Sequence, residues 1–364
     1  MSHAATFQRQ WGARETAPAP VRATLDDKAM LLAAADVTRA LNVPKPAIYW
    51  ADLIGSALLG YVALAGALAL QSPLAAVSGA VAVLALYRAG SFIHELTHIK
   101  KGAIPGFRMA WNLLVGVPLL VPSFLYEGVH NQHHAKRYYG TADDPEYLPL
   151  ALMRPWTLPL FLVAAVLAPV AMLGRFAILA PLSLLFPKLR PLVVGRYSGL
   201  QINPRFRRPA PEGEFKRQWA RQETAASLWA ITLLALTAAN VIALREFGIL
   251  LGIASGVMFL NQVRTLVAHL WENDGEPMSV TAQYLDSVNV PPPATLPVLW
   301  APVGLRYHAL HHLLPGLPYH ALGKAHRRLC VALGEASPYH VASHRRMSKL
   351  VARLAASSLR TAQK

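Results

Sequence analysis

Residues 51–70 read ADLIGSALLGYVALAGALAL, a run whose only charge is Asp52 at its edge. As a helix rising 1.5 Å per residue, this run would be about 30 Å long, which matches the hydrocarbon thickness of a bilayer. Three further apolar runs cover residues 74–87, 226–244 and 247–263. Only 15% of the 364 residues are charged, against about 25% in soluble domains, and 54% are apolar. The sequence therefore predicts an integral membrane protein with four transmembrane helices.

The links between these runs predict how the helices pair. The first two runs are joined by QSP and the last two by RE, and such short links favour antiparallel hairpins. Lys and Arg concentrate in residues 1–50, in 187–225 and after 320, whereas the hairpin tips contain only Arg245. The positive-inside rule then predicts that both termini and the central segment 187–225 lie in the cytoplasm. We expect an integral membrane protein, of the inner membrane if the source is a bacterium, with its active site on the cytoplasmic side. Contact with anionic lipid headgroups explains the net charge of +16, and no nucleic-acid partner is expected.

The chain divides into three parts by composition. We expect a cytoplasmic arm over 1–50, a membrane domain over 51–330 and a basic cytoplasmic tail over 331–364. Two more apolar stretches, 104–127 and 151–186, are interrupted by Pro and Gly, and the sequence leaves open whether they span the membrane. The predicted fold is an all-α membrane protein with four transmembrane helices in two hairpins and a cytoplasmic His-rich helical cap.

Eight of the 14 histidines fall into three short clusters. The clusters are HELTH at 94–98, HNQHH at 130–134 and HALHH at 308–312, and His269 follows the last apolar run. Spacings of three and four residues place each cluster on one helical face, and the hairpins bring all of them to one side of the membrane. Nine imidazoles are too many for one zinc ion with four ligands, and they suit two ions of a metal such as iron.

The motif set resembles the integral-membrane fatty acid desaturases and their hydroxylase relatives. The resemblance spans roughly 50–330 and includes the flanking segments HHAKRYYGTADDPEY, NQVRTLVAH and HALHHLLPGLPYHALGKAHRRL. It implies a non-haem di-iron centre that uses O₂ and two electrons on an acyl lipid or acyl thioester substrate. The metal ligands implied by the resemblance are His94, His98, His130, His133, His134, His308, His311 and His312, with His269 as the ninth.

From this resemblance we expect an O₂-dependent fatty-acyl desaturase that introduces a double bond. The alternative is a related membrane di-iron lipid hydroxylase or ketolase, since both reactions use the same kind of site. The chain contains no G-x-G-x-x-G motif, so no flavin or nicotinamide domain is expected within it. An external donor, ferredoxin-like or similar, would then deliver the electrons, and the protein would work among membrane lipids.

Three alternative functions would use some of the same residues. His94-Glu95-Leu96-Thr97-His98 spells H-E-x-x-H, the motif of zinc metalloproteases, and Asp274 could complete an intramembrane protease site. A carboxylate-bridged site would use the two E-x-x-H motifs that begin at Glu95 and Glu127. A His-rich metal transporter would need ionisable residues within the spans. The protease leaves both H-x-x-H-H clusters unexplained. The carboxylate-bridged site lacks two further suitably placed Glu, and the predicted spans contain almost no ionisable residues for a transporter.

The sequence offers several acidic residues that could support the ligands. Glu95 and Glu127 are interpreted as possible acceptors for imidazole N–H groups. Asp143, Asp144 and Glu146 could orient ligands, pair with basic loops or cap a turn, and a structural role is favoured.

Overall fold

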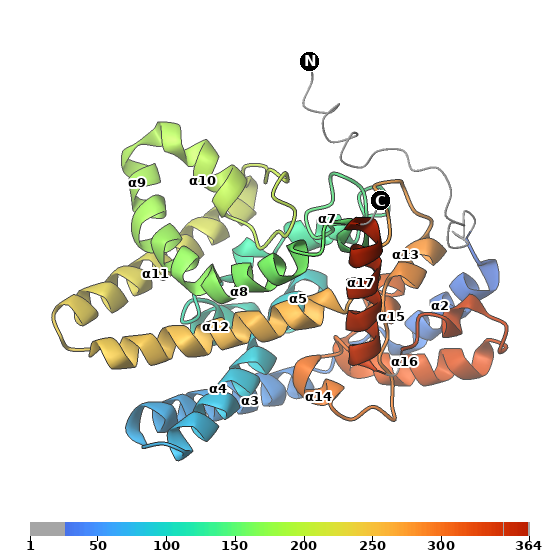
Figure 1. Cartoon of the computed structure of the whole chain (residues 1–364), viewed down its shortest axis with the longest axis horizontal. Helices are drawn as coiled ribbons and strands as arrows, with labels where there is room; N and C mark the ends of the chain where they lie inside the picture. Colours follow the sequence, from blue (N-terminus) through green and yellow to red (C-terminus); the bar gives the residue numbers. More distant parts are fainter. Residues whose placement is uncertain (1–25, 345, 363–364) are drawn as a thin grey trace.

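The computed structural model describes residues 26–344 and 346–362, and these residues are helical without β-strands (Figure 1). Residues 1–25 of the predicted arm lie outside the described residues. Short π and 3-10 segments interrupt or connect the helices. The α-helices are α2 (Lys28–Leu41), α3 (Pro46–Ala69), α4 (Leu74–Gly90), α5 (Phe92–His98), α6 (Phe107–Trp111), α7 (Val129–His133), α8 (Thr157–Gly174), α9 (Ala180–Leu185), α10 (Arg190–Tyr197), α11 (Gly213–Ala238), α12 (Leu244–Leu266), α13 (Val280–Asp286), α14 (Pro297–Trp300), α15 (His308–Leu313), α16 (Tyr319–Ala332) and α17 (Met347–Ala362).

Four helices are long and apolar enough to cross a membrane, as the sequence predicted. They are α3, the continuous helix formed by α4 and α5, the helix formed by α8 and α9, and α12. Their outer faces carry large apolar side chains that the protein itself does not cover. Leu58, Leu167 and Leu184 are 63%, 58% and 70% exposed. Such faces fit a lipid environment, and the fold is that of a membrane protein.

One predicted span is wrong in the structure, and another stretch supplies the fourth candidate. The run 226–244 belongs to α11, which begins at Gly213 with charged residues and ends at Ala238. Its apolar part covers about fourteen residues, or about 20 Å, which is too short to span. The helix from Thr157 to Leu185 takes its place despite its internal Pro169. The stretch 104–127 breaks into short segments and forms no span among the described residues.

The four long helices lie side by side on one half of the molecule (Figure 1). α3 packs along α4, and α12 packs against both α8 and α4. Ala82 and Leu86 of α4 are buried against Ile253 and Val257 of α12. The hairpin arrangement of the four spans stays a prediction.

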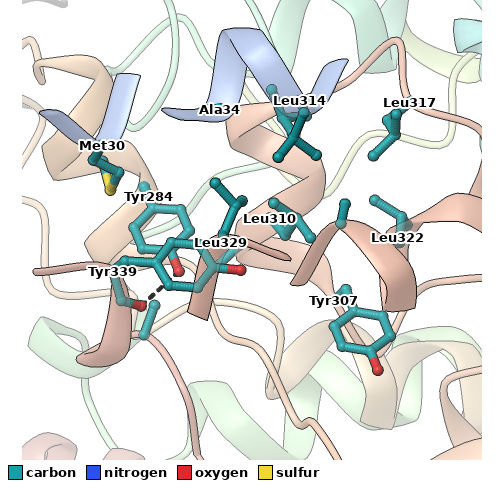
Figure 2. Packing of buried hydrophobic residues seen from close by; sticks show 14 of the residues in the cluster. Met30, Ala34, Tyr284, Tyr307, Leu310, Leu314, Leu317, Leu322, Leu329 and Tyr339 are labelled. Atoms are coloured by element: carbon teal, nitrogen blue, oxygen red, sulfur yellow. Dashed lines mark hydrogen bonds between the residues drawn. The ribbon is translucent and has the colours of Figure 1, made fainter. Parts of the chain in front are cut away.

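A second apolar core holds the short helices of the other half (Figure 2). Met30 and Ala34 of α2 pack in one cluster with Leu310 of α15 and Leu329 of α16. The Tyr284 hydroxyl nearby donates a 2.7 Å hydrogen bond to the carbonyl of residue 339. Because Leu310 lies inside HALHH, this core fixes the orientation of the third histidine cluster.

Candidate metal centre

The first histidine cluster ends a candidate membrane span. α5 continues α4, so His94 and His98 are one helical turn apart on the same face. Their imidazole rings lie 5.2 Å apart. His94 is buried, and neither of its ring nitrogens has a hydrogen-bond partner among the described residues. A buried polar nitrogen without a partner is costly, and a metal ion would supply the partner for one of the two.

The remaining ligand candidates come from short helices and one loop. His130 and His133 lie in α7, and His134 directly follows it. Gly128 starts α7 with a φ of 82°, a backbone conformation that glycine adopts without strain. α15 carries the third cluster, and His269 follows α12 in an extended loop.

The nine predicted ligands fall into two groups. In each group, every residue offers one nitrogen, and these nitrogens all lie within 4.8 Å of one another. α7 and α15 each contribute to both groups, because residues four apart share a face and the remaining histidine points to the other side. Group one is His94, His98, His130, His134 and His311, and group two is His133, His269, His308 and His312.

The distances between ring nitrogens favour metal coordination over hydrogen bonding. The Nε2 atoms of His98 and His311 lie 3.1 Å apart, and those of His134 and His311 lie 3.2 Å apart. Nitrogens about 2.1 Å from one metal ion stand about 3.0 Å apart at an angle of about 90° and about 3.4 Å apart in a tetrahedron. A neutral imidazole has only one N–H, so a cluster of converging Nε2 atoms cannot be satisfied by hydrogen bonds alone. The residues present fit two metal ions.

Burial keeps most of these imidazoles in the form that binds metal. It lowers the pKa of His134, His269 and His312 well below the ordinary 6.5, and neighbouring imidazoles lower it further. These side chains are therefore neutral at pH 7, as metal ligation requires. His133 differs. Burial would lower its pKa, but the adjacent Asp144 charge outweighs this and raises it.

Carboxylates behind the ligands orient the imidazole rings. The Nδ1 atom of His133 lies 2.9 Å from Asp144, and that of His130 lies 3.1 Å from Glu146. Burial raises the pKa of Glu146 to about 7. A hydrogen bond at Nδ1 fixes the ring and leaves Nε2 free to bind metal. The structural role favoured for Asp144 and Glu146 in the sequence is therefore incomplete, because both side chains contact a ligand.

His269 is held by residues that sequence reasoning missed. Its Nδ1 atom lies 2.8 Å from the Tyr139 hydroxyl, which donates a 2.9 Å hydrogen bond to Asp286. Tyr147 donates to the same carboxylate at 3.1 Å. Burial raises the pKa of Asp286 to about 6. Tyr139 and Tyr147 both lie in the flanking segment HHAKRYYGTADDPEY, whereas Asp286 lies outside the segments that carry the family resemblance.

The glutamates proposed as ligand supports have other partners. Glu95 accepts a 2.6 Å hydrogen bond from the Tyr49 hydroxyl and a 3.2 Å bond from the backbone N–H of residue 319. Glu127 pairs with Arg108 and accepts from Ser123. Neither carboxylate contacts a ligand nitrogen among the described residues. The H-E-x-x-H interpretation also loses its third ligand, since Asp274 belongs to neither group.

All nine candidate ligands lie in a segment that matches a known protein family. The family model for fatty acid desaturase matches residues 70–344, which contain all nine histidines. The chain belongs to the fatty acid desaturase family. One similar protein is the ceramide hydroxylase of Caulobacter vibrioides. The two sequences are 50% identical over 323 residues, which cover 88% of this chain and 91% of that protein. No solved structure matches this member of the desaturase family.

Proposed function

We propose that this protein is a membrane lipid hydroxylase that acts on ceramide or a close sphingolipid relative. The observation that carries the proposal is the 50% identity, over nearly the full length of both chains, to a protein named ceramide hydroxylase. This revises the expectation of a fatty-acyl desaturase and favours the alternative of a lipid hydroxylase. The same histidine groups serve either reaction.

The proposed site would hold two iron ions, one in each histidine group. When bound, iron would activate O₂ so that one oxygen atom enters a C–H bond and the other leaves as water with two electrons and two protons. The chain's own residues keep the imidazoles neutral and fix their rings through Asp144, Glu146 and Asp286. The apolar helices would deliver the lipid and exclude water from the reacting carbon.

Desaturation is the second candidate, because the matching family model is that of fatty acid desaturase. The test is expression in a bacterial host that makes no sphingolipid, with a short-chain ceramide supplied and lipids analysed by mass spectrometry. Hydroxylation adds one oxygen atom to the ceramide, whereas desaturation removes two hydrogen atoms. A product with one added oxygen, absent with the H311A variant, would support the proposal. New double bonds in ceramide or host acyl chains, without added oxygen, would overturn it in favour of the desaturase.

The electrons would come from an external donor on the cytoplasmic side. An acidic, ferredoxin-like protein suits a chain with a net charge of +16. Turnover with such a donor should slow as salt concentration rises, since salt screens the attraction between the two proteins. A rate that does not change with salt would argue against electrostatic docking.

A further inference from the structure

A buried arginine lies next to the metal centre without an ionic partner. Arg264, in the last turn of α12, is only 7% exposed, and its Nε has no hydrogen-bond partner. Among the described residues, no carboxylate lies within the 4.0 Å of an ion pair. Two other buried arginines have acceptors for their guanidinium groups, one through an ion pair and one through backbone carbonyls. Arg175 pairs with Glu223 at 2.5 Å, and Arg208 donates to two backbone carbonyls.

Arg264 lies between the histidine groups and the membrane-spanning half. It precedes the ligand His269 by five residues, and its side chain contacts the hydroxyl of Tyr87 on α4. Its charge acts on His94 of group one and on His269 and His308 of group two. The guanidinium is therefore within electrostatic range of both metal positions.

The described fold offsets the burial of this charge only in part: the Tyr87 hydroxyl contacts the guanidinium and Glu146 attracts it, but Nε keeps no hydrogen-bond partner. A guanidinium stays protonated in proteins, and moving it out of water costs several kcal/mol unless it is paired. Positive metal ions nearby would raise that cost. An oxygen acceptor on a bound molecule would supply the missing partner, and the five N–H donors of Arg suit a carbonyl or hydroxyl oxygen.

An apolar cavity of about 110 Å³ lies deeper among the spans. It is lined by side chains of α3, α4, α8, α11 and α12, including Leu86, Phe247 and Ile253. Leu86 is the residue before Tyr87, and Ile253 lies about 16 Å from Arg264 along α12 at 1.5 Å per residue. No lining residue lies nearer to Arg264 along α12 than Ala254, so the cavity suits the far end of a lipid chain whose polar end lies beside the guanidinium.

We propose that Arg264 binds the polar part of the lipid substrate, donating to an amide carbonyl or hydroxyl oxygen, and so places a neighbouring carbon at the metal centre. This inference rests on the proposed function and adds a regiochemical consequence. The oxidised carbon lies within a few bonds of that oxygen. Carbons in the middle of an acyl chain are too far from the guanidinium to be the target.

The test compares the wild type with R264M and R264K, using R353M as a matched control. Arg353 pairs with Glu272 on the surface, 2.7 Å away, and contacts neither histidine group. Iron content, binding of a short-chain ceramide in detergent, KM and kcat are measured for each. A charged hydrogen bond is worth enough for R264M to weaken ceramide binding and raise KM about tenfold or more. Iron should remain at the wild-type level, and R264K should recover part of the binding.

Three results would overturn the inference. Loss of iron in both Arg264 variants would assign the guanidinium to the metal centre alone. Equal ceramide binding by wild type and R264M would show that it contacts no substrate oxygen, or that water satisfies it. A hydroxyl group placed in the middle of the acyl chain by tandem mass spectrometry would contradict the regiochemistry. The measurement of ceramide binding separates this inference from the proposed function, because binding can be measured even if no ceramide is hydroxylated.

Discussion

The Nε2 atoms of His98 and His311 lie 3.1 Å apart although 213 residues separate them in the sequence. His98 ends a candidate membrane span, and His311 lies in a short helix fixed by the second apolar core. The candidate metal centre therefore lies where the half with the long helices meets the half with the short helices, and its integrity depends on both.

Removing one ligand of group one should empty one metal position. We expect H311A to contain about one iron ion per chain, instead of two, and to form no oxidised lipid, because group one would lose a central ligand. Iron is measured by elemental analysis of the purified protein. H320Q is the control, since His320 accepts a hydrogen bond from the backbone of residue 45 and belongs to neither group. Full iron content in H311A would contradict the assignment of His311.

Two neighbouring aspartates provide a sharp comparison. Asp144 is fully buried and lies 2.9 Å from Nδ1 of His133, whereas Asp143 is exposed. D144N should lower iron affinity or turnover about 10- to 100-fold, because loss of the charge weakens the orientation and basicity of the imidazole. D143N should leave both near wild type. Chelator competition gives the affinity, and equal effects of the two substitutions would show that the contact with His133 is unimportant.

Glu95 should matter for stability more than for the reaction. In E95A the Tyr49 hydroxyl stays buried without its acceptor, so the free energy of unfolding should fall by about 1–3 kcal/mol. In E95Q the amide oxygen can still accept this bond, so both iron and product formation should persist. Thermal unfolding and iron analysis of the two variants test this. An E95Q protein with full iron but no activity would restore Glu95 as a catalytic base.

Acid should destabilise the half with the short helices, because His326 lies buried in α16. Burial first, and then nearby positive groups, lower its pKa from 6.5 to about 4 in the folded protein. The unfolded chain therefore binds the proton more readily, and the stability given by the neutral imidazole is lost as pH falls from about 6.5 to about 4. H326Q keeps an acceptor for the Tyr339 hydroxyl, which lies 2.8 Å from Nδ1. Its melting temperature should fall less over this window, and identical pH profiles would disprove the effect.

The local features of this chain were predictable, whereas the long-range ones were not. The three histidine clusters follow from spacings within five residues, which any helix converts into a shared face. The span at 226–244 failed because the apolar run continues past Ala238, where the helix ends. Asp286 and Tyr139 meet across 147 residues, and no short motif predicts such a contact. The unpaired Nε of Arg264 also emerges only from the packed structure, because it depends on which side chains surround the guanidinium.

The split of α7 and α15 between the two groups has a consequence for biosynthesis. Neither group can be complete until residues 308–312 have left the ribosome, after all four candidate spans have been made. If the two groups bind metal as proposed, a nascent chain would hold it only through incomplete, weaker sites. Metal loading would then be a late step of biosynthesis, completed only after the half with the long helices and the half with the short helices have come together.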